Sequence, residues 1–135
     1  MTSDSDISTL LRPRLERDAH GRLIAIYVFG SFARGEMRAD SDIDIAFLHE
    51  QSFEPVAVFT IAQELASSLH RDVDLIDLRR APTALRAQVI GEGRRIHTGD
   101  ELATGTFEMY TLSDFARLNE ERREILESLA ARYRA

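Results

Sequence analysis

The sequence predicts an α+β domain that ends in a long helix. Three observations support this fold class. Residues 23–29 form seven consecutive apolar positions, which is typical of a strand buried on both faces. Strand-like and helix-like patterns alternate through the middle of the chain, and apolar residues recur at helical spacing over 107–133. A chain of 135 residues suits one domain, 1–135, with a core at about 20–100 and a C-terminal helical segment at about 106–133.

The N-terminal part predicts a helix followed by the first strand. Apolar residues keep helical spacing over 7–15, and Asp4 or Ser5 is a plausible cap, whereas Pro13 weakens the second half of the helix. The apolar run 23–29 then forms a strand, and Gly30 ends it.

Two more strands and two more helices follow. The segment 42–48 predicts a second strand, 72–78 a third, and 94–98 a short edge strand. The helix 55–69 begins with proline, and a further helix opens at 81–82 and stops at Gly91 and Gly93. The apolar side of helix 55–69 comprises Val58, Phe59, Ala62, Leu65, Ala66 and Leu69.

The last third of the chain predicts one long helical pattern with a possible break near Ser113 and Asp114. Helical spans of this length often extend beyond their own domain. The stripe of this pattern is marked by Phe115, Leu118, Arg122, Ile125, Leu126, Leu129 and Tyr133.

Charge and composition exclude several classes of function. The net charge of −6 argues against extended nucleic-acid binding, which needs a clustered basic surface. All seventeen basic residues are arginine, so a lysine nucleophile, Schiff base or Walker-type lysine is excluded. Without cysteine there is neither a disulfide framework nor a thiolate zinc site. We expect a cytoplasmic protein with no membrane association; the oligomeric state is left open.

A Gly-Ser pair follows the first strand directly. Gly30 lets the backbone approach a ligand, and Ser31 can offer its hydroxyl and amide to a phosphate. The alternative for Ser31 is an ordinary helix cap. After Ser31 and ten intervening residues come Asp42 and Asp44, whose side chains share one face of the second strand and can share divalent ions.

The Asp-x-Asp pair has a simpler alternative, a hydrophilic turn at the entrance of the strand. Its position argues against that alternative, because Asp44 lies between Ile43 and Ile45, where an uncompensated carboxylate is costly. Asp74 on the third strand would complete a cluster of three carboxylates if the two strands are neighbours. Otherwise Asp74 merely faces solvent.

These motifs resemble a known family. Gly30-Ser31, then Asp42-Ile43-Asp44, then Val73-Asp74-Leu75 are similar to the nucleotidyltransferase superfamily that includes DNA polymerase β and the aminoglycoside nucleotidyltransferases. The small size of the chain and its local sequence around these motifs resemble the minimal nucleotidyltransferase antitoxins of the MntA type, which are encoded beside HEPN ribonuclease toxins of the HepT type. The similarity is strong over about 23–95.

The resemblance implies a polymerase β-like fold, with a small mixed sheet flanked by helices, and a set of roles. Asp42 and Asp44 would bind Mg2+, two ions being expected, and Gly30 and Ser31 would cradle the triphosphate of ATP. Asp74 would be a third metal ligand or the base that deprotonates the acceptor. The reaction would transfer AMP to a tyrosine of the cognate toxin and so neutralise it, which makes the protein an antitoxin of a type VII toxin–antitoxin system.

Two arginines follow the Gly-Ser pair closely enough to reach a β- or γ-phosphate. For Arg34 the alternative is a surface ion pair with Glu36 or Asp40, and for Arg38 such an ion pair is the preferred interpretation.

Two other functions stay open at this point. The protein could neutralise the toxin by binding alone, with the long C-terminal helix as the docking surface. It could also transfer a nucleotide to a small molecule such as an aminoglycoside, although a chain of this size has no additional domain to enclose one.

Overall fold

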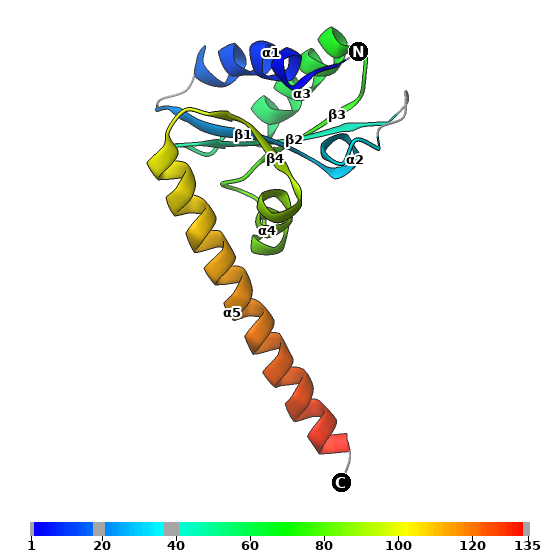
Figure 1. Ribbon diagram of the computed structural model, residues 1–135, viewed down its shortest axis with the longest axis vertical. Helices are drawn as coiled ribbons and strands as arrows, with labels where there is room; N and C mark the ends of the chain where they lie inside the picture. Colours follow the sequence, from blue (N-terminus) through cyan, green and yellow to red (C-terminus); the bar gives the residue numbers. More distant parts are fainter. Residues whose placement is uncertain (1, 18–20, 37–40, 134–135) are drawn as a thin grey trace.

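A computed structural model describes residues 2–17, 21–36 and 41–133. The chain folds into one four-stranded sheet with helices on both faces (Figure 1). The elements are α1 (Asp4–Arg17), β1 (Leu23–Phe29), α2 (Gly30–Ala33), β2 (Ile43–His49), α3 (Pro55–Leu69), β3 (Val73–Asp77), α4 (Thr83–Glu92), β4 (Arg94–Thr98) and α5 (Glu101–Tyr133).

The sheet is mixed, with the strand order β3-β2-β1-β4. β1 pairs antiparallel with both β2 and β4, whereas β2 and β3 are parallel and are joined through α3. β3 and β4 therefore form the two edges, and β1, which is buried along its whole length, lies inside the sheet. The predicted strands 23–29 and 94–98 agree with β1 and β4, and the parallel neighbours β2 and β3 carry the two acidic motifs.

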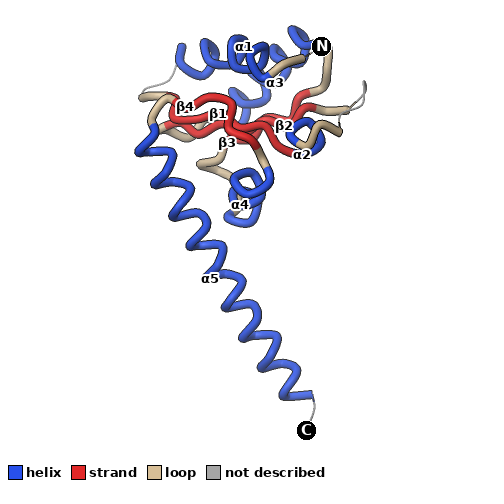
Figure 2. Tube along the Cα trace, viewed as in Figure 1, coloured by secondary structure: helices blue, strands red, loops and turns tan. Residues whose placement is uncertain are grey.

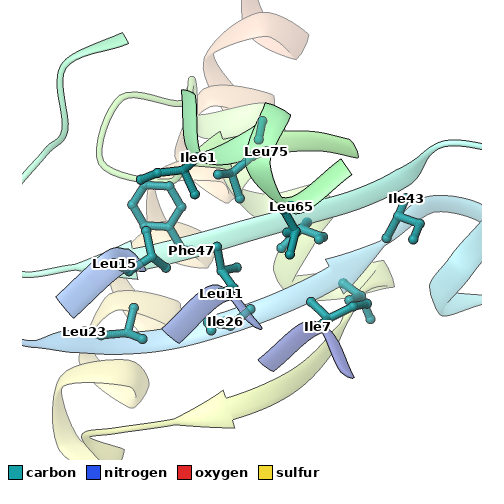
Figure 3. Packing of buried hydrophobic residues seen from close by; sticks show 13 residues of the cluster. Ile7, Leu11, Leu15, Leu23, Ile26, Ile43, Phe47, Ile61, Leu65 and Leu75 are labelled. Atoms are coloured by element: carbon teal, nitrogen blue, oxygen red, sulfur yellow. The ribbon is translucent and has the colours of Figure 1, made fainter. Parts of the chain in front are cut away.

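One face of the sheet is covered by α1 and α3 (Figures 1 and 2). Ile7, Leu11 and Leu15 are spaced by one helical turn and are fully buried, so α1 presents one apolar stripe to the sheet. They meet Phe47 of β2 and Leu65 of α3 in a continuous core (Figure 3). Ile43, Ile45 and Phe47, the apolar residues at odd positions of β2, form the side of this core that belongs to the sheet.

The opposite face is covered by α4 and the first turns of α5 (Figure 2). Tyr27, Ala46 and Leu48 belong to this second core, and Phe107 of α5 packs against it. The hydroxyl of Tyr27 donates a hydrogen bond to Glu108 Oε1 at 2.8 Å. This bond ties the start of α5 to the central strand of the sheet.

The N-terminal helix differs from its prediction at both ends. Its first turn is capped by Ser3, not by Asp4 or Ser5: the Ser3 amide donates to Asp6 Oδ2 at 3.0 Å, and the Asp6 amide donates to Ser3 Oγ at 3.1 Å. The helix also continues through Pro13 to Arg17. Buried Leu15 lies beyond the proline, so packing against the sheet holds a turn that local propensity disfavours.

Three predictions about the other helices were wrong, one of them the stop at Gly91, which lies within α4 while Gly93 is its C-cap. α5 begins at Glu101 and runs without a break through Ser113 and Asp114, because Asp114 forms an ion pair with Arg117 within the helix and buried Thr111 packs one turn earlier. Phe59, which was expected on the apolar side of α3, is 64% exposed; Ile61 is buried in its place.

Within the described ranges, every helix is too short or too polar to cross a lipid bilayer.

Candidate active site

The topology brings the predicted motifs to one end of the sheet. Because β1 and β2 are antiparallel, the last residue of β1 lies beside the first residues of β2, and Phe29 pairs with Asp44. Because β2 and β3 are parallel, their first residues lie together, and Asp44 pairs with Asp74. Gly30 follows Phe29 directly. The register alone therefore places the Gly-Ser pair and both acidic motifs side by side.

The carboxylates emerge from the face of the sheet that α4 and α5 cover. Side chains alternate along a strand, so Asp44 projects to the same side as Ala46 and Leu48, which belong to the core under α4 and α5. Asp74 shares this face because it is the register partner of Asp44. Asp44 is half-buried, whereas Asp42 and Asp74 are exposed. The arrangement is an acidic edge that opens to solvent.

The electrostatics of Asp44 identify it as the centre of this edge. Its pKa is raised above the ordinary value, first by burial and then by the negative charges of Asp74 and Asp42. The positive charge of Arg34 acts in the opposite direction. A carboxylate held close to two others gains when a cation is bound among them, because the cation offsets both the repulsion and the loss of hydration.

The turn after β1 is shaped around Asp44. Gly30 has a φ of +66°, and a Cβ atom at this position would lie 2.2 Å from Oδ2 of Asp44. Only glycine can therefore occupy position 30 while Asp44 keeps its place. Phe29 is the N-cap residue of the short helix α2, so Ser31 is not its cap, and that alternative interpretation is wrong. Ser31 lies within the first turn, beside the acidic edge.

Arg34 forms a surface ion pair with Glu36, which was the alternative to a phosphate contact. Its side chain is exposed, and Nε donates to Glu36 Oε2 at 3.0 Å. Its charge still acts on Asp44, as the pKa of that carboxyl shows. An exposed ion pair of this kind is worth little and can be exchanged for a phosphate contact. Arg38 and Asp40 lie outside the described residues.

A residue that the sequence did not single out holds the turn in place. Arg94, the first residue of β4, donates from Nη1 to the backbone oxygen of Ala33 at 3.0 Å. It also binds both carboxylate oxygens of Asp4 at 2.8 and 3.0 Å. Its guanidinium lies 5.9 Å from the ring centroid of Phe32. Arg94 thus joins α1, α2 and the edge strand β4, three elements that are far apart in the sequence.

The two other acids of the β3 segment have separate places. Asp77 is buried and accepts hydrogen bonds from the amides of Phe53, at 2.8 Å, and Arg79, at 3.0 Å. It stabilises the loop before α3, as expected for a side chain that points away from Asp74. Asp72 is exposed at the entrance of the strand, and its backbone oxygen accepts from the Ile43 amide at 2.9 Å.

The donor set suits a hard divalent cation. No three His, Asp or Glu side chains in the described part of the chain come together as a complete metal site. Mg2+ is usually held by one or two carboxylates together with water and the phosphates of a substrate, so an incomplete protein cage agrees with this ion. The all-oxygen character of the acidic edge and the raised pKa of Asp44 fit it as well.

Comparisons with known proteins agree with this geometry. A family model described as polymerase beta, nucleotidyltransferase matches residues 15–102. The chain is 39% identical over 118 residues to a protein named protein adenylyltransferase MntA from Shewanella oneidensis, covering 87% of this chain and 84% of that protein.

Solved structures extend the similarity to the whole fold. A crystal structure described as a toxin–antitoxin with AMP-PNP is 37% identical, with a TM-score of 0.80 over 95% of this chain and 98% of that chain. A structure of tri-AMPylated Shewanella oneidensis HEPN toxin in complex with MNT antitoxin is 35% identical, with a TM-score of 0.75 over 93% of this chain and 94% of that chain. The chain therefore belongs to the polymerase β nucleotidyltransferase family.

Proposed function

We propose that this protein is an antitoxin that transfers AMP from ATP to a tyrosine of a HEPN-type toxin and thereby neutralises it. The similarity to a protein adenylyltransferase and to toxin–antitoxin complexes over nearly the whole chain supports this function. The observation that carries it is the register of Asp44, which lies between Phe29, next to the Gly-Ser pair, and Asp74.

The side chains of the edge have distinct roles in this proposal. Asp42 and Asp44 hold Mg2+, and Gly30 and Ser31 receive the triphosphate where the backbone is free of a side chain. Arg34 leaves Glu36 to contact the β- or γ-phosphate. When bound, the metal supplies positive charge that neutralises the phosphates and lowers the cost of ionising the acceptor hydroxyl.

The transfer is an in-line displacement at the α-phosphorus of ATP. The tyrosine oxygen forms a new bond to this phosphorus while the bond to the oxygen that bridges to the β-phosphate breaks, and pyrophosphate departs. The phenol has an ordinary pKa near 10, so its proton needs an acceptor. Asp74 takes that role, or that of a third metal ligand; the face that it shares with Asp44 and its exposure support this assignment.

The open acidic edge favours a protein acceptor over a small molecule. Asp42 and Asp74 are exposed, and the described part of the chain has no second domain that could enclose an aminoglycoside. A partner protein can exclude water from the edge when it delivers its tyrosine. The reaction requires ATP and suits the cytoplasm.

The test is transfer of label from ATP labelled at the α-phosphate, in the presence of Mg2+, to a purified HEPN-type toxin. The wild-type protein should label that partner, and Asp42→Asn combined with Asp44→Asn should abolish labelling. Glu16→Gln, a change of an exposed carboxylate on α1, is the matched control and should label normally. Labelling that survives the double change would refute the proposal.

The exposed C-terminal half of α5 favours a second candidate, neutralisation by binding alone. The ribonuclease activity of the toxin separates the two. If the Asp42→Asn/Asp44→Asn protein still silences the toxin in the absence of ATP, binding suffices. If silencing needs ATP and both aspartates, transfer is the mechanism.

A further inference from the structure

The two halves of α5 have different surroundings. The first three turns pack against the sheet and α4: Thr104 and Thr111 are buried, and Phe107 contacts the core. The second half projects away from the rest of the described domain (Figure 1). There Leu118 is 41%, Ile125 60% and Leu129 41% exposed.

The exposed residues continue the buried face of the same helix. The positions 104, 111, 118, 125 are seven apart, and 107 and 129 fall three or four residues from members of this series. The apolar stripe of α5, defined as Leu118, Ile125, Leu126 and Leu129, is therefore the extension of the side that packs on the domain. Its apolar character is not explained by anything that it touches within the described chain.

An uncovered apolar stripe of this kind implies a partner. A helix of this length without tertiary packing is only marginally stable in water, and most helical stability in proteins comes from burial of an apolar face. Contiguous exposed apolar residues bordered by charges are typical of an interaction site. The border here is dense: Glu121, Glu124 and Arg132 lie along the stripe around Ile125 and Leu129.

A single charged residue within the stripe indicates what kind of surface covers it. Arg122 lies four residues after Leu118 and three before Ile125, on the apolar side. Arg117 pairs with Asp114, and Arg123 with Glu120, but Arg122 has no ion pair with any residue in the described ranges. A buried guanidinium needs a carboxylate opposite it.

Parallel pairing of two copies of this helix does not supply that carboxylate. In a parallel pair, Arg122 of one copy faces Arg122 of the other at the seam, and the two like charges oppose association. A different protein with an acidic residue amid apolar ones removes this conflict. The charge on the stripe therefore favours a heterologous partner over a parallel pair of two copies of the chain.

The stripe and the acidic edge lie on the same side of the sheet. Asp44 projects from the face that α4 and α5 cover, as its neighbours Ala46 and Leu48 do. In Figure 1, α5 starts near the end of β1 that is farther from α2, and it slopes so that its C-terminal end lies below α2. A protein bound along the stripe would thus lie on the side to which the carboxylates point.

We propose that the apolar stripe of α5, with Arg122 at its centre, is the surface on which the acceptor protein docks, and that Arg122 pairs with a carboxylate of that protein. The acceptor is the HEPN-type toxin, so the inference rests on the proposed function for the identity of its partner. Docking on α5 holds the acceptor under the acidic edge, where its tyrosine can be presented.

Two adjacent arginines allow a matched test. Arg122→Glu reverses the charge on the stripe, whereas Arg123→Glu makes the same change on the other side of the helix, where the side chain is exposed and pairs with Glu120. Binding of each variant to the purified HEPN protein is measured by titration calorimetry without ATP. Arg122→Glu should raise the Kd at least about tenfold, and Arg123→Glu should leave it within about twofold.

A second pair of measurements checks the apolar part. Leu118→Ala combined with Leu129→Ala should also raise the Kd at least about tenfold while the helical circular dichroism of the domain is retained. Equal Kd values for Arg122→Glu and Arg123→Glu would overturn the proposal. So would a wild-type chain that sediments as a dimer and becomes a monomer when Leu118 and Leu129 are replaced.

The binding measurement does not depend on the chemical step. If the wild-type protein binds the HEPN protein through Arg122 but does not label it, nucleotide transfer is refuted and the docking surface is retained. Normal labelling with binding that is indifferent to Arg122 would refute the docking surface alone.

Discussion

The carboxylate of Asp44 occupies the space that a side chain on Gly30 would need, with Oδ2 2.2 Å from the position of an ideal Cβ. The turn after β1 and the acid on β2 are therefore fitted to each other. A change at position 30 must move either the turn that is proposed to receive the triphosphate or the carboxylate that is proposed to hold the metal.

The first prediction is that Gly30→Ala lowers the rate of transfer by more than its effect on stability explains. Gly30 and Gly35 both have positive φ, +66° and +72°, so alanine at either position should lower the free energy of unfolding by about 1–2 kcal/mol. Nothing lies within 4 Å of a Cβ at Gly35. We expect a loss of activity of about 100-fold for Gly30→Ala and little loss for Gly35→Ala.

Urea unfolding and initial rates of labelling measure the two effects separately. Similar loss of activity in both variants would show that backbone strain, and not the contact with Asp44, is responsible.

The second prediction concerns Asp44 and pH. Its pKa is raised above 3.8 by burial and by the charges of Asp74 and Asp42, so the folded state binds this proton more tightly than the unfolded state. Ionisation of Asp44 therefore lowers the free energy of unfolding as the pH rises from below 3.8 through the folded-state pKa.

Asp44→Asn removes this charge. Without divalent metal, the variant should be more stable than the wild type at neutral pH, and the gain should shrink as the pH falls below the ordinary range of an aspartate. Urea denaturation in the presence of EDTA over this range measures the difference. A variant that is less stable at neutral pH would contradict the electrostatic account.

The third prediction is that Arg94 supports nucleotide binding from outside the site. It binds Ala33 in the proposed phosphate turn and Asp4 in α1. Arg94→Ala should raise the KM for ATP about tenfold through displacement of α2. Arg94→Lys should restore little, because lysine cannot make the paired bonds to Asp4 and Ala33.

The neighbouring Arg95, which pairs with Glu108 of α5 at 3.7 Å, is the control. Arg95→Ala should leave the KM for ATP within about twofold, since its partly exposed ion pair joins β4 to α5 and not to α2. An equal rise in both variants would indicate a general loss of stability at β4.

The fourth prediction concerns His49, which is fully buried at the end of β2. Burial lowers its pKa below 6.5, and its Nδ1 accepts a hydrogen bond from the Gln51 amide at 3.0 Å, which protonation would remove. The unfolded state therefore binds this proton more readily, and the free energy of unfolding falls as the pH drops below 6.5.

His49→Phe should be less stable than the wild type at neutral pH but should show a shallower loss in acid. His97, whose pKa is also lowered by burial, accounts for part of the remaining slope. Urea midpoints at neutral and mildly acidic pH measure both slopes. An unchanged slope in His49→Phe would exclude His49 as a source of the acid sensitivity.

Much of the fold was predictable because its signals are local. The apolar run of β1 and the proline that begins α3 fix those elements at the predicted residues. The errors arose where packing overrode local propensity: α1 passes through Pro13 because Leu15 is buried, and α5 is continuous through Ser113 and Asp114.

By itself, the sequence determined the residue types of the site and their spacing, since alternation along the predicted strand 42–48 assigns Asp42 and Asp44 to one face, although β2 itself begins at Ile43. Only the tertiary structure decided that Asp74 is the register partner of Asp44, that Gly30 has no room for a side chain, and that Arg94 holds the turn. The physical reason is that strand pairing and steric contact join residues distant in the chain, whereas sequence periodicity reports only which face of its own element a residue occupies.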